Sequence, residues 1–175
     1  MEKLTQMPPK RSKSPDDYYT PDWAVAPLIQ FLNKNWVVWE CAIGGGNMAD
    51  SLTKRGFKVV GIRDDDFLNK DSEKKFEFDC IITNPPFSLK DEFLERCYEI
   101  GKPFAMLLPI TALEGKFRHK LYRKYGIQLL LFDKRVNYIN HKGDNGCWFP
   151  SCWFIGNMGL SKDINFVEIN NTQKE

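Results

Sequence analysis

Phe78-Asp79-Cys80-Ile81-Ile82-Thr83-Asn84-Pro85-Pro86-Phe87 is the stretch that decides the fold. Its first half is a short run of β-favouring apolar residues with the length of a buried parallel strand. The two prolines lack backbone N–H groups and fix φ, so the strand must end at them. The residue before a proline is held in extended geometry, which places Asn84 at the carboxyl end of the strand. Because open α/β sheets bind ligands at that end, the stretch predicts a site as well as a strand.

Strands and helices are predicted to alternate on both sides of this stretch. Hydrophobic patterns predict helical segments over 22–32, 47–56, 88–97 (with Ser88 as the N-terminal cap) and 111–124. They predict strands over 36–39, 58–62, 102–109 and 126–132, then a strand, a polar loop and a returning strand over 133–155, and a last strand over 164–169. This alternation predicts an α/β, doubly wound sheet.

A second motif joins the first predicted strand to the next helix. It reads Glu40-Cys41-Ala42-Ile43-Gly44-Gly45-Gly46-Asn47-Met48. Glycines between a strand and a helix let the backbone approach a ligand closely, as in nucleotide-binding folds. The spacing differs from the dinucleotide Gly-x-Gly-x-x-Gly fingerprint.

Asn84-Pro85-Pro86-Phe87 resembles the signature of S-adenosylmethionine-dependent methyltransferases that act on exocyclic amino groups, most of all the adenine-amino DNA methyltransferases. The resemblance implies a Rossmann-like, seven-stranded, mostly parallel sheet with a C-terminal antiparallel hairpin. In the implied chemistry, the Asn84 oxygen and the Pro85 carbonyl accept the amine hydrogens, and Phe87 stacks on the target base. The residue types alone also fit a strand that runs into a proline turn, with Phe87 in the core.

The resemblance also implies a set of cofactor-binding residues. Glu40 would hold the ammonium group of S-adenosylmethionine, and Asp66 and Phe67 would contact its adenine. The position where such enzymes carry a ribose-binding acid holds Arg63, so Asp64 is the nearest substitute. The full predicted set is Tyr19, Thr20, Pro21, Glu40, Ala42, Gly44, Gly46, Asn47, Met48, Asp64, Asp66, Phe67 and Asn84. No metal site is predicted, because the two histidines are far apart and no Cys-x-x-Cys pair occurs.

Candidate nucleic-acid contacts lie mainly in the basic segment from Lys116 to Arg135. By composition this segment fits either a nucleic-acid face or a solvated helix face. Pro150-Ser151 before an apolar strand resembles the same stretch of small phage-type adenine methyltransferases. In the amino-methyltransferases a C-terminal hairpin helps to enclose the target base, so the resemblance implies that Ser151 and Trp148 border the base pocket. The predicted contacts are Lys116, Arg118, Lys120, Arg123, Arg135 and Ser151.

Composition sets the remaining expectations. The chain has 175 residues, a net charge of +2 and five cysteines. These values are typical of one soluble domain with reduced thiols, here over 16–169, preceded by a disordered basic arm over 1–15 and followed by a loose tail over 170–175. The absence of a signal peptide or membrane-length apolar run predicts a cytoplasmic protein with no membrane partner.

Three function classes remain open from the sequence. The first is methyl transfer to adenine N6 in DNA, with weak sequence specificity or with specificity from a partner subunit or self-association, because there is no room for a separate recognition domain. The second is the same chemistry on RNA or on a protein glutamine. The third is an inactive, cofactor-binding accessory protein, which Arg63 favours and an intact Asn84-Pro85-Pro86-Phe87 opposes.

Overall fold

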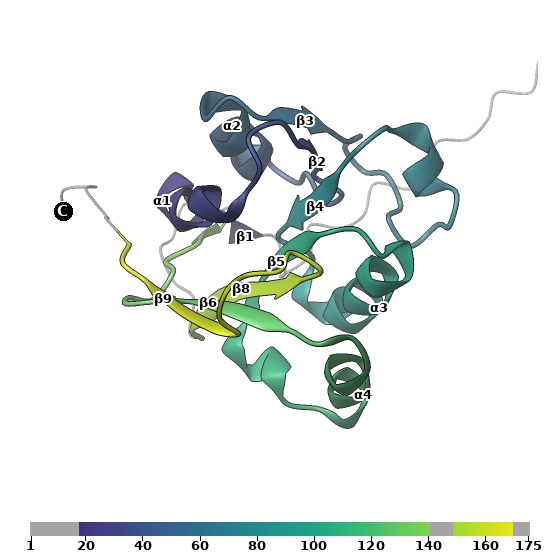
Figure 1. The fold of residues 1–175 in the computed structure, drawn as a ribbon. Helices are drawn as coiled ribbons and strands as arrows, with labels where there is room; N and C mark the ends of the chain where they lie inside the picture. The colour runs from purple at the N-terminus through teal and green to yellow at the C-terminus, as the bar shows by residue number, and fades with distance from the viewer. Residues whose placement is uncertain (1–17, 141–148, 170–175) are drawn as a thin grey trace, which may run out of the picture.

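A single seven-stranded sheet organises the chain in the computed structural model, which describes residues 18–140 and 149–169 (Figure 1). The strand order is β3-β2-β4-β5-β8-β6-β9. The strands are β2 Val37–Trp39, β3 Lys58–Val60, β4 Cys80–Thr83, β5 Phe104–Pro109, β6 Gln128–Phe132, β8 Ser151–Gly156 and β9 Ile164–Val167. Only β8 runs antiparallel to its neighbours within this sheet. The predicted α/β, Rossmann-like, doubly wound sheet with a C-terminal antiparallel strand is confirmed.

Helices cover both faces of the sheet. On one face lie α1 Asp22–Val25, the 3₁₀ helix η1 Ala26–Phe31, which contains Pro27, and α2 Asn47–Lys54. On the other face lie α3 Lys90–Ile100 and α4 Lys116–Tyr125. Short 3₁₀ turns occur at η2 Ser72–Lys75, η3 Phe87–Leu89 and η4 Ile110–Leu113. A two-stranded ladder outside the main sheet pairs β1 Tyr18–Tyr19 with β7 Ile139–Asn140.

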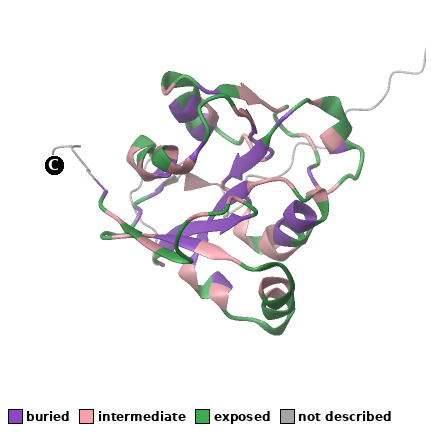
Figure 2. Ribbon diagram, viewed as in Figure 1, coloured by how far each residue is buried: buried purple, intermediate pink, exposed green. Residues whose placement is uncertain are grey.

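The core lies along the central strands, which Figure 2 shows as buried. Every residue of β4, β5 and β8 is buried. Strands buried on both faces read as continuous apolar runs, which is why 80–83 and 104–109 were recognisable from sequence. Side chains alternate between a core on the α1 and α2 side, such as Ile82 and Leu107, and a core on the α3 and α4 side, such as Ile81 and Met106.

Two local predictions are wrong. Residues 133–138 form no strand, although Val136 and Tyr138 alternate with exposed neighbours as a strand would. The ladder with β9 ends at the Asp133 N–H, which donates to the Val167 carbonyl, and the chain next joins a ladder at β7. The helix after the prolines begins as a 3₁₀ turn at Phe87, and Leu89 rather than Ser88 takes the N-cap position of α3.

Some predicted segments lie outside the described residues. They are the basic arm over 1–15, the tail over 170–175, and the loop that contains Trp148. Within the described parts of the chain, no helix has the length and apolar character needed to cross a membrane.

Candidate active site

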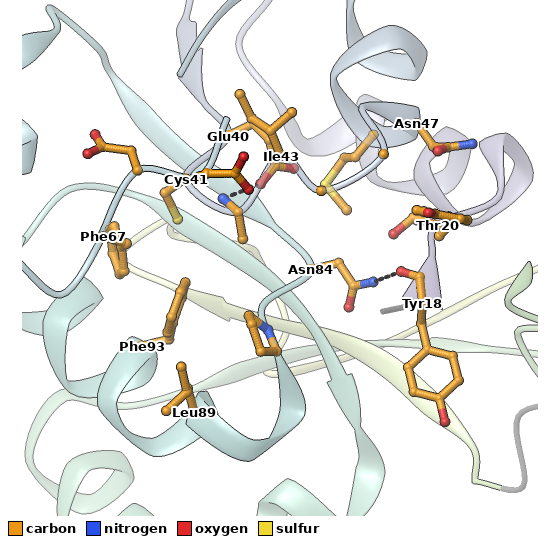
Figure 3. A pocket seen from close by; sticks show the side chains of 18 of the residues that line it. Tyr18, Thr20, Glu40, Cys41, Ile43, Asn47, Phe67, Asn84, Leu89 and Phe93 are labelled. Atoms are coloured by element: carbon orange, nitrogen blue, oxygen red, sulfur yellow. Dashed lines mark hydrogen bonds between the residues drawn. The ribbon is translucent and has the colours of Figure 1, made fainter. Parts of the chain in front are cut away.

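A cavity lies at the carboxyl ends of β2 and β4 (Figure 3). The helix after β2 crosses to one face of the sheet, whereas the helix after β4 crosses to the other face. The boundary between β2 and β4 is therefore the topological switch point, where open α/β sheets bind their ligands. Five segments line the cavity: the Tyr18–Thr20 segment, the glycine turn after β2, the loop over 64–68, the turn after β4, and the start of α3 with Leu89 and Phe93.

Glycine geometry brings the Tyr18–Thr20 segment against the turn after β2. Gly44 and Gly46 have φ of +50° and +89°, which side chains with a Cβ rarely adopt. A Cβ on Gly45 would lie only 2.5 Å from the ring of Tyr19, so a larger residue would push that ring away. The triple glycine thus closes the turn tightly and lets α2 begin at Asn47 beside the cavity.

Glu40 places a buried carboxylate on the cavity wall. Its residue surface is 1% exposed, and both of its hydrogen bonds reach Oε1. The Thr83 hydroxyl donates at 2.6 Å and the Ala42 N–H donates at 2.9 Å. Burial raises the pKa of Glu40 to about 7, although these two hydrogen bonds act to lower it. A cation in the cavity would favour the ionised carboxylate by direct charge attraction.

Asn84 lines the same cavity and has an unused acceptor. Its Nδ2 donates to the Tyr18 carbonyl at 3.0 Å, which fixes the amide orientation because a carbonyl can only accept (Figure 3). Its Oδ1 is buried and accepts no hydrogen bond from the described residues. Leaving a buried acceptor unsatisfied costs about 1–3 kcal/mol, so the arrangement is suited to a ligand that brings a donor.

Phe87 belongs to an aromatic cluster beside Asn84. Its ring stacks on Tyr18 with a centroid distance of 5.6 Å and an interplanar angle of 24°. Phe149 and Tyr138 meet Phe87 edge to face, at 5.1 Å and 6.2 Å. Phe87 is not among the residues that line the cavity, and Tyr18 already covers one of its faces. Base stacking on Phe87 stays a prediction.

The aspartate loop after β3 contributes a second unused acceptor, at Asp65. Lys75 donates to Asp65 Oδ1 at 2.6 Å, whereas Oδ2 is buried and accepts no hydrogen bond from the described residues. Asp64 also lines the cavity but is exposed, and Asp66 Oδ1 accepts the Leu68 N–H. Sequence reasoning chose Asp64 and Asp66. Three adjacent aspartates carry no signal that would have singled out the one whose oxygen is enclosed.

Arg63, at the position where an acid was expected, braces the glycine turn. Its Nη1 donates to the Gly44 carbonyl at 2.5 Å, and its side chain does not line the cavity. The cation therefore stabilises the turn from outside. Phe67 both lines the cavity and belongs to the core. It is 2% exposed, and its ring packs against Trp39 and Phe93.

Most predicted cofactor residues do meet at the cavity. Those that line it are Tyr19, Thr20, Glu40, Ala42, Gly44, Asn47, Met48, Asp64, Asp66, Phe67 and Asn84, together with Pro86 of the predicted catalytic set. Those that do not line it are Pro21, which precedes α1, Gly46, which caps α2, and Pro85, which is buried. Sequence reasoning missed Thr83 and Tyr18, whose roles are to position Glu40 and Asn84.

The predicted nucleic-acid contacts are spread over several surfaces. Lys116, Lys120 and Arg123 are exposed on α4. Arg118 forms an ion pair with Asp91 at 2.5 Å that ties α4 to α3.

The other two predicted contacts lie away from α4. Arg135 borders a separate cavity with Trp23, on the α1 side of the sheet. Ser151 is 6% exposed, and its hydroxyl is buried at the start of β8.

Comparisons with known proteins add a structural similarity but no sequence match. No protein-family model matches the sequence, and no curated protein matches it. Among solved structures, the chain is similar to precorrin-6y C5,15-methyltransferase from Geobacter metallireducens GS-15. The two share 11% identity and a TM-score of 0.44 over 74% of this chain and 84% of that chain. The fold assignment rests on the strand order.

Proposed function

We propose that this protein is an S-adenosylmethionine-dependent methyltransferase that acts on the N6 amino group of adenine in DNA. The observation that carries the proposal is the buried, unpartnered Oδ1 of Asn84, held in place at the switch-point cavity by the Tyr18 carbonyl. An exocyclic amine is a weak nucleophile because its lone pair is delocalised into the ring. An acceptor that binds an amine hydrogen and orients that lone pair provides the catalysis such a reaction needs.

The residues around the cavity fit the cofactor. Glu40 offers a buried carboxylate to its ammonium group, and Asp65 Oδ2 offers an enclosed acceptor to its ribose hydroxyls. The Gly44–Gly46 turn lets the backbone approach it closely. When bound, the cofactor would supply an electrophilic methyl group. The cavity encloses about 180 Å³, less than the roughly 300–1,000 Å³ of pockets that hold drug-sized ligands, so part of the cofactor stays exposed or the Tyr18–Thr20 segment opens.

The target base would approach from the side of the aromatic cluster. Asn84 lies between the cavity and this cluster, since it lines the cavity and is bonded to Tyr18, whose ring stacks on Phe87. A base must leave the duplex to reach an enclosed acceptor, and aromatic rings are the usual surface on which an extruded base stacks. Tyr18 and Phe87 supply such a surface next to the orienting amide.

A basic surface near the same sheet edge supports a nucleic-acid substrate. Lys116 and Lys120 are exposed and four residues apart, so they lie on one side of α4. Helix α4 begins shortly after the carboxyl end of β5, through the 3₁₀ turn Ile110–Leu113, and so starts at the edge that holds the cavity. Lysines at this place can neutralise backbone phosphates while the base enters the site.

The test is a radiolabelled methyl-transfer assay with four substrates: unmethylated duplex DNA, single-stranded DNA, structured RNA and cell extract. Label in DNA that digests to N6-methyladenosine derivatives supports the proposal. Label only in RNA or only in protein would keep the amine chemistry and replace the substrate. No label in any substrate, with cofactor binding intact by calorimetry, would instead favour a cofactor-binding accessory protein.

A further inference from the structure

The outer edge of β9 carries exposed apolar side chains. β9 pairs with β6 on one side and has no strand on its other side among the described residues (Figure 1). Phe166 is 81% exposed and Ile164 is 52% exposed, on the strand that Figure 2 colours largely as solvent-accessible. An open strand edge with large apolar side chains is a surface that invites pairing with another chain.

Backbone geometry fixes which residues of β9 can pair outward. The N–H of Leu129 donates to the Asp163 carbonyl, and the N–H of Asp133 donates to the Val167 carbonyl. Backbone polar groups alternate in direction along a strand, so Asp163, Asn165 and Val167 point towards β6. The N–H and C=O groups of Ile164 and Phe166 therefore point away from the sheet.

The side chains of the outward-pairing residues form a pattern that is complementary to itself. Ile164 and Phe166 share one face of β9, with Lys162 just before the strand and Glu168 just after it. When two copies run antiparallel about a two-fold axis at Asn165, Ile164 lies opposite Phe166 of the second copy. Lys162, which precedes the strand, then comes near Glu168 of the second copy, which follows it. Each Ile164–Phe166 pair then exchanges both of its N–H···O bonds, as directly opposed residues of an antiparallel ladder do.

Other registers lose this complementarity. A shift by one residue would place the outward N–H and C=O groups of one copy opposite residues of the other copy whose N–H and C=O groups point towards β6. No ladder could then form. A shift by two residues places Ile164 opposite Glu168 in one direction, or Phe166 opposite Lys162 in the other. Only the register centred on Asn165 matches apolar with apolar and acidic with basic side chains.

We propose that the β9 edge is a self-association surface that joins two copies of this chain, through antiparallel β9–β9 pairing about Asn165, into one continuous sheet. The interface is isologous, so each contact occurs twice. The inference does not rest on the chemistry of the cavity.

Charge reversal tests the register directly. Sedimentation equilibrium would be measured for the wild type, Lys162→Glu, Glu168→Lys, an equimolar mixture of these two variants, and the double variant. Each single variant sets like charges opposite each other at both ends of the ladder, so its dissociation constant should rise roughly tenfold or more. The mixture and the double variant restore opposite charges at both ends, and both should dimerise as the wild type does.

Phe166→Ser, with Phe117→Ser as the matched control, tests the apolar contact. Phe117 is 40% exposed on α4, away from β9, so its removal should leave the dimer intact while Phe166→Ser dissociates it. Circular dichroism confirms that each variant is folded. A wild type that stays monomeric up to its solubility limit overturns the proposal, as would occur if another protein covered β9. A dissociation constant that none of these substitutions changes also overturns the proposal. So does an equimolar mixture that dimerises no more tightly than either single variant alone.

Discussion

Replacing Glu40 with Gln should stabilise the free protein and weaken cofactor binding. The carboxyl pKa rises from 4.5 to about 7 on folding, chiefly through burial. The folded chain thus binds this proton more tightly than the unfolded chain. The stabilising effect of protonation is complete below about pH 4.5 and is lost as the pH rises through about 7.

The magnitude follows from the shift. At 1.36 kcal/mol per pKa unit, the raised pKa of Glu40 lowers the free energy of unfolding, relative to its value at acid pH, by about 3 kcal/mol at pH 8 but by only about 1 kcal/mol at pH 5. A glutamine oxygen can still accept from Thr83 and Ala42, so Glu40→Gln should remove this loss. Denaturant unfolding at pH 8 should show a gain of about 3 kcal/mol, with a much smaller gain at pH 5.

Glu95→Gln is the matched control, because Glu95 is exposed on α3. Its substitution should change the free energy of unfolding by less than about 0.5 kcal/mol at either pH. Calorimetry of Glu40→Gln with S-adenosylmethionine should show binding at least about a hundredfold weaker, because a buried cation would lose its partner. If Glu40→Gln lowered the free energy of unfolding at pH 8, or raised it equally at both pH values, the result would refute the claim that burial disfavours an ionised carboxylate that is kept there for a ligand.

Three further results are expected. Thr83→Val removes a donor that favours the ionised Glu40 carboxylate, so S-adenosylmethionine affinity at pH 7 should fall about tenfold and recover partly at pH 9. Wild-type affinity at pH 7 would argue against this positioning role of Thr83. Asp65→Asn should weaken cofactor binding about tenfold or more in calorimetry, whereas Asp64→Asn should change it less than about threefold; the opposite ranking would restore Asp64 as the ribose ligand. Lys116→Ala with Lys120→Ala should weaken duplex binding and reduce the salt slope in fluorescence titrations by about 2, and an unchanged slope would place the nucleic acid elsewhere.

Local sequence signals predicted most of the fold. The apolar run before Asn84 and the glycine turn at Gly44–Gly46 each define a strand end from a few adjacent residues. Short-range patterns of this kind placed each motif at the end of a strand, whereas the structure shows that the two strands, β2 and β4, are neighbours. Val136 and Tyr138 show where the approach failed, because alternation predicts which side chains are buried but not whether the backbone finds a ladder partner.

The contacts that complete the site are long-range. The Tyr18 carbonyl meets Asn84 across 66 positions, and the Thr83 hydroxyl meets Glu40 across 43. A backbone carbonyl has no residue-type signature, and a threonine at a strand end is ordinary β-sheet composition. The orientation of Asp65 likewise depends on Lys75, which bonds one carboxylate oxygen, while the other is buried and accepts no hydrogen bond from the described residues. None of these relations can be read from spacing.

The most direct measurement compares wild type and Asn84→Ala for both methyl transfer to unmethylated duplex DNA and S-adenosylmethionine affinity. Asn84 Oδ1 is the acceptor assigned to the amine, so the variant should lose at least about a hundredfold in transfer rate while its cofactor affinity changes less than about threefold. Equal losses in transfer and in cofactor affinity would contradict the assignment, as would a variant that methylates adenine at the wild-type rate.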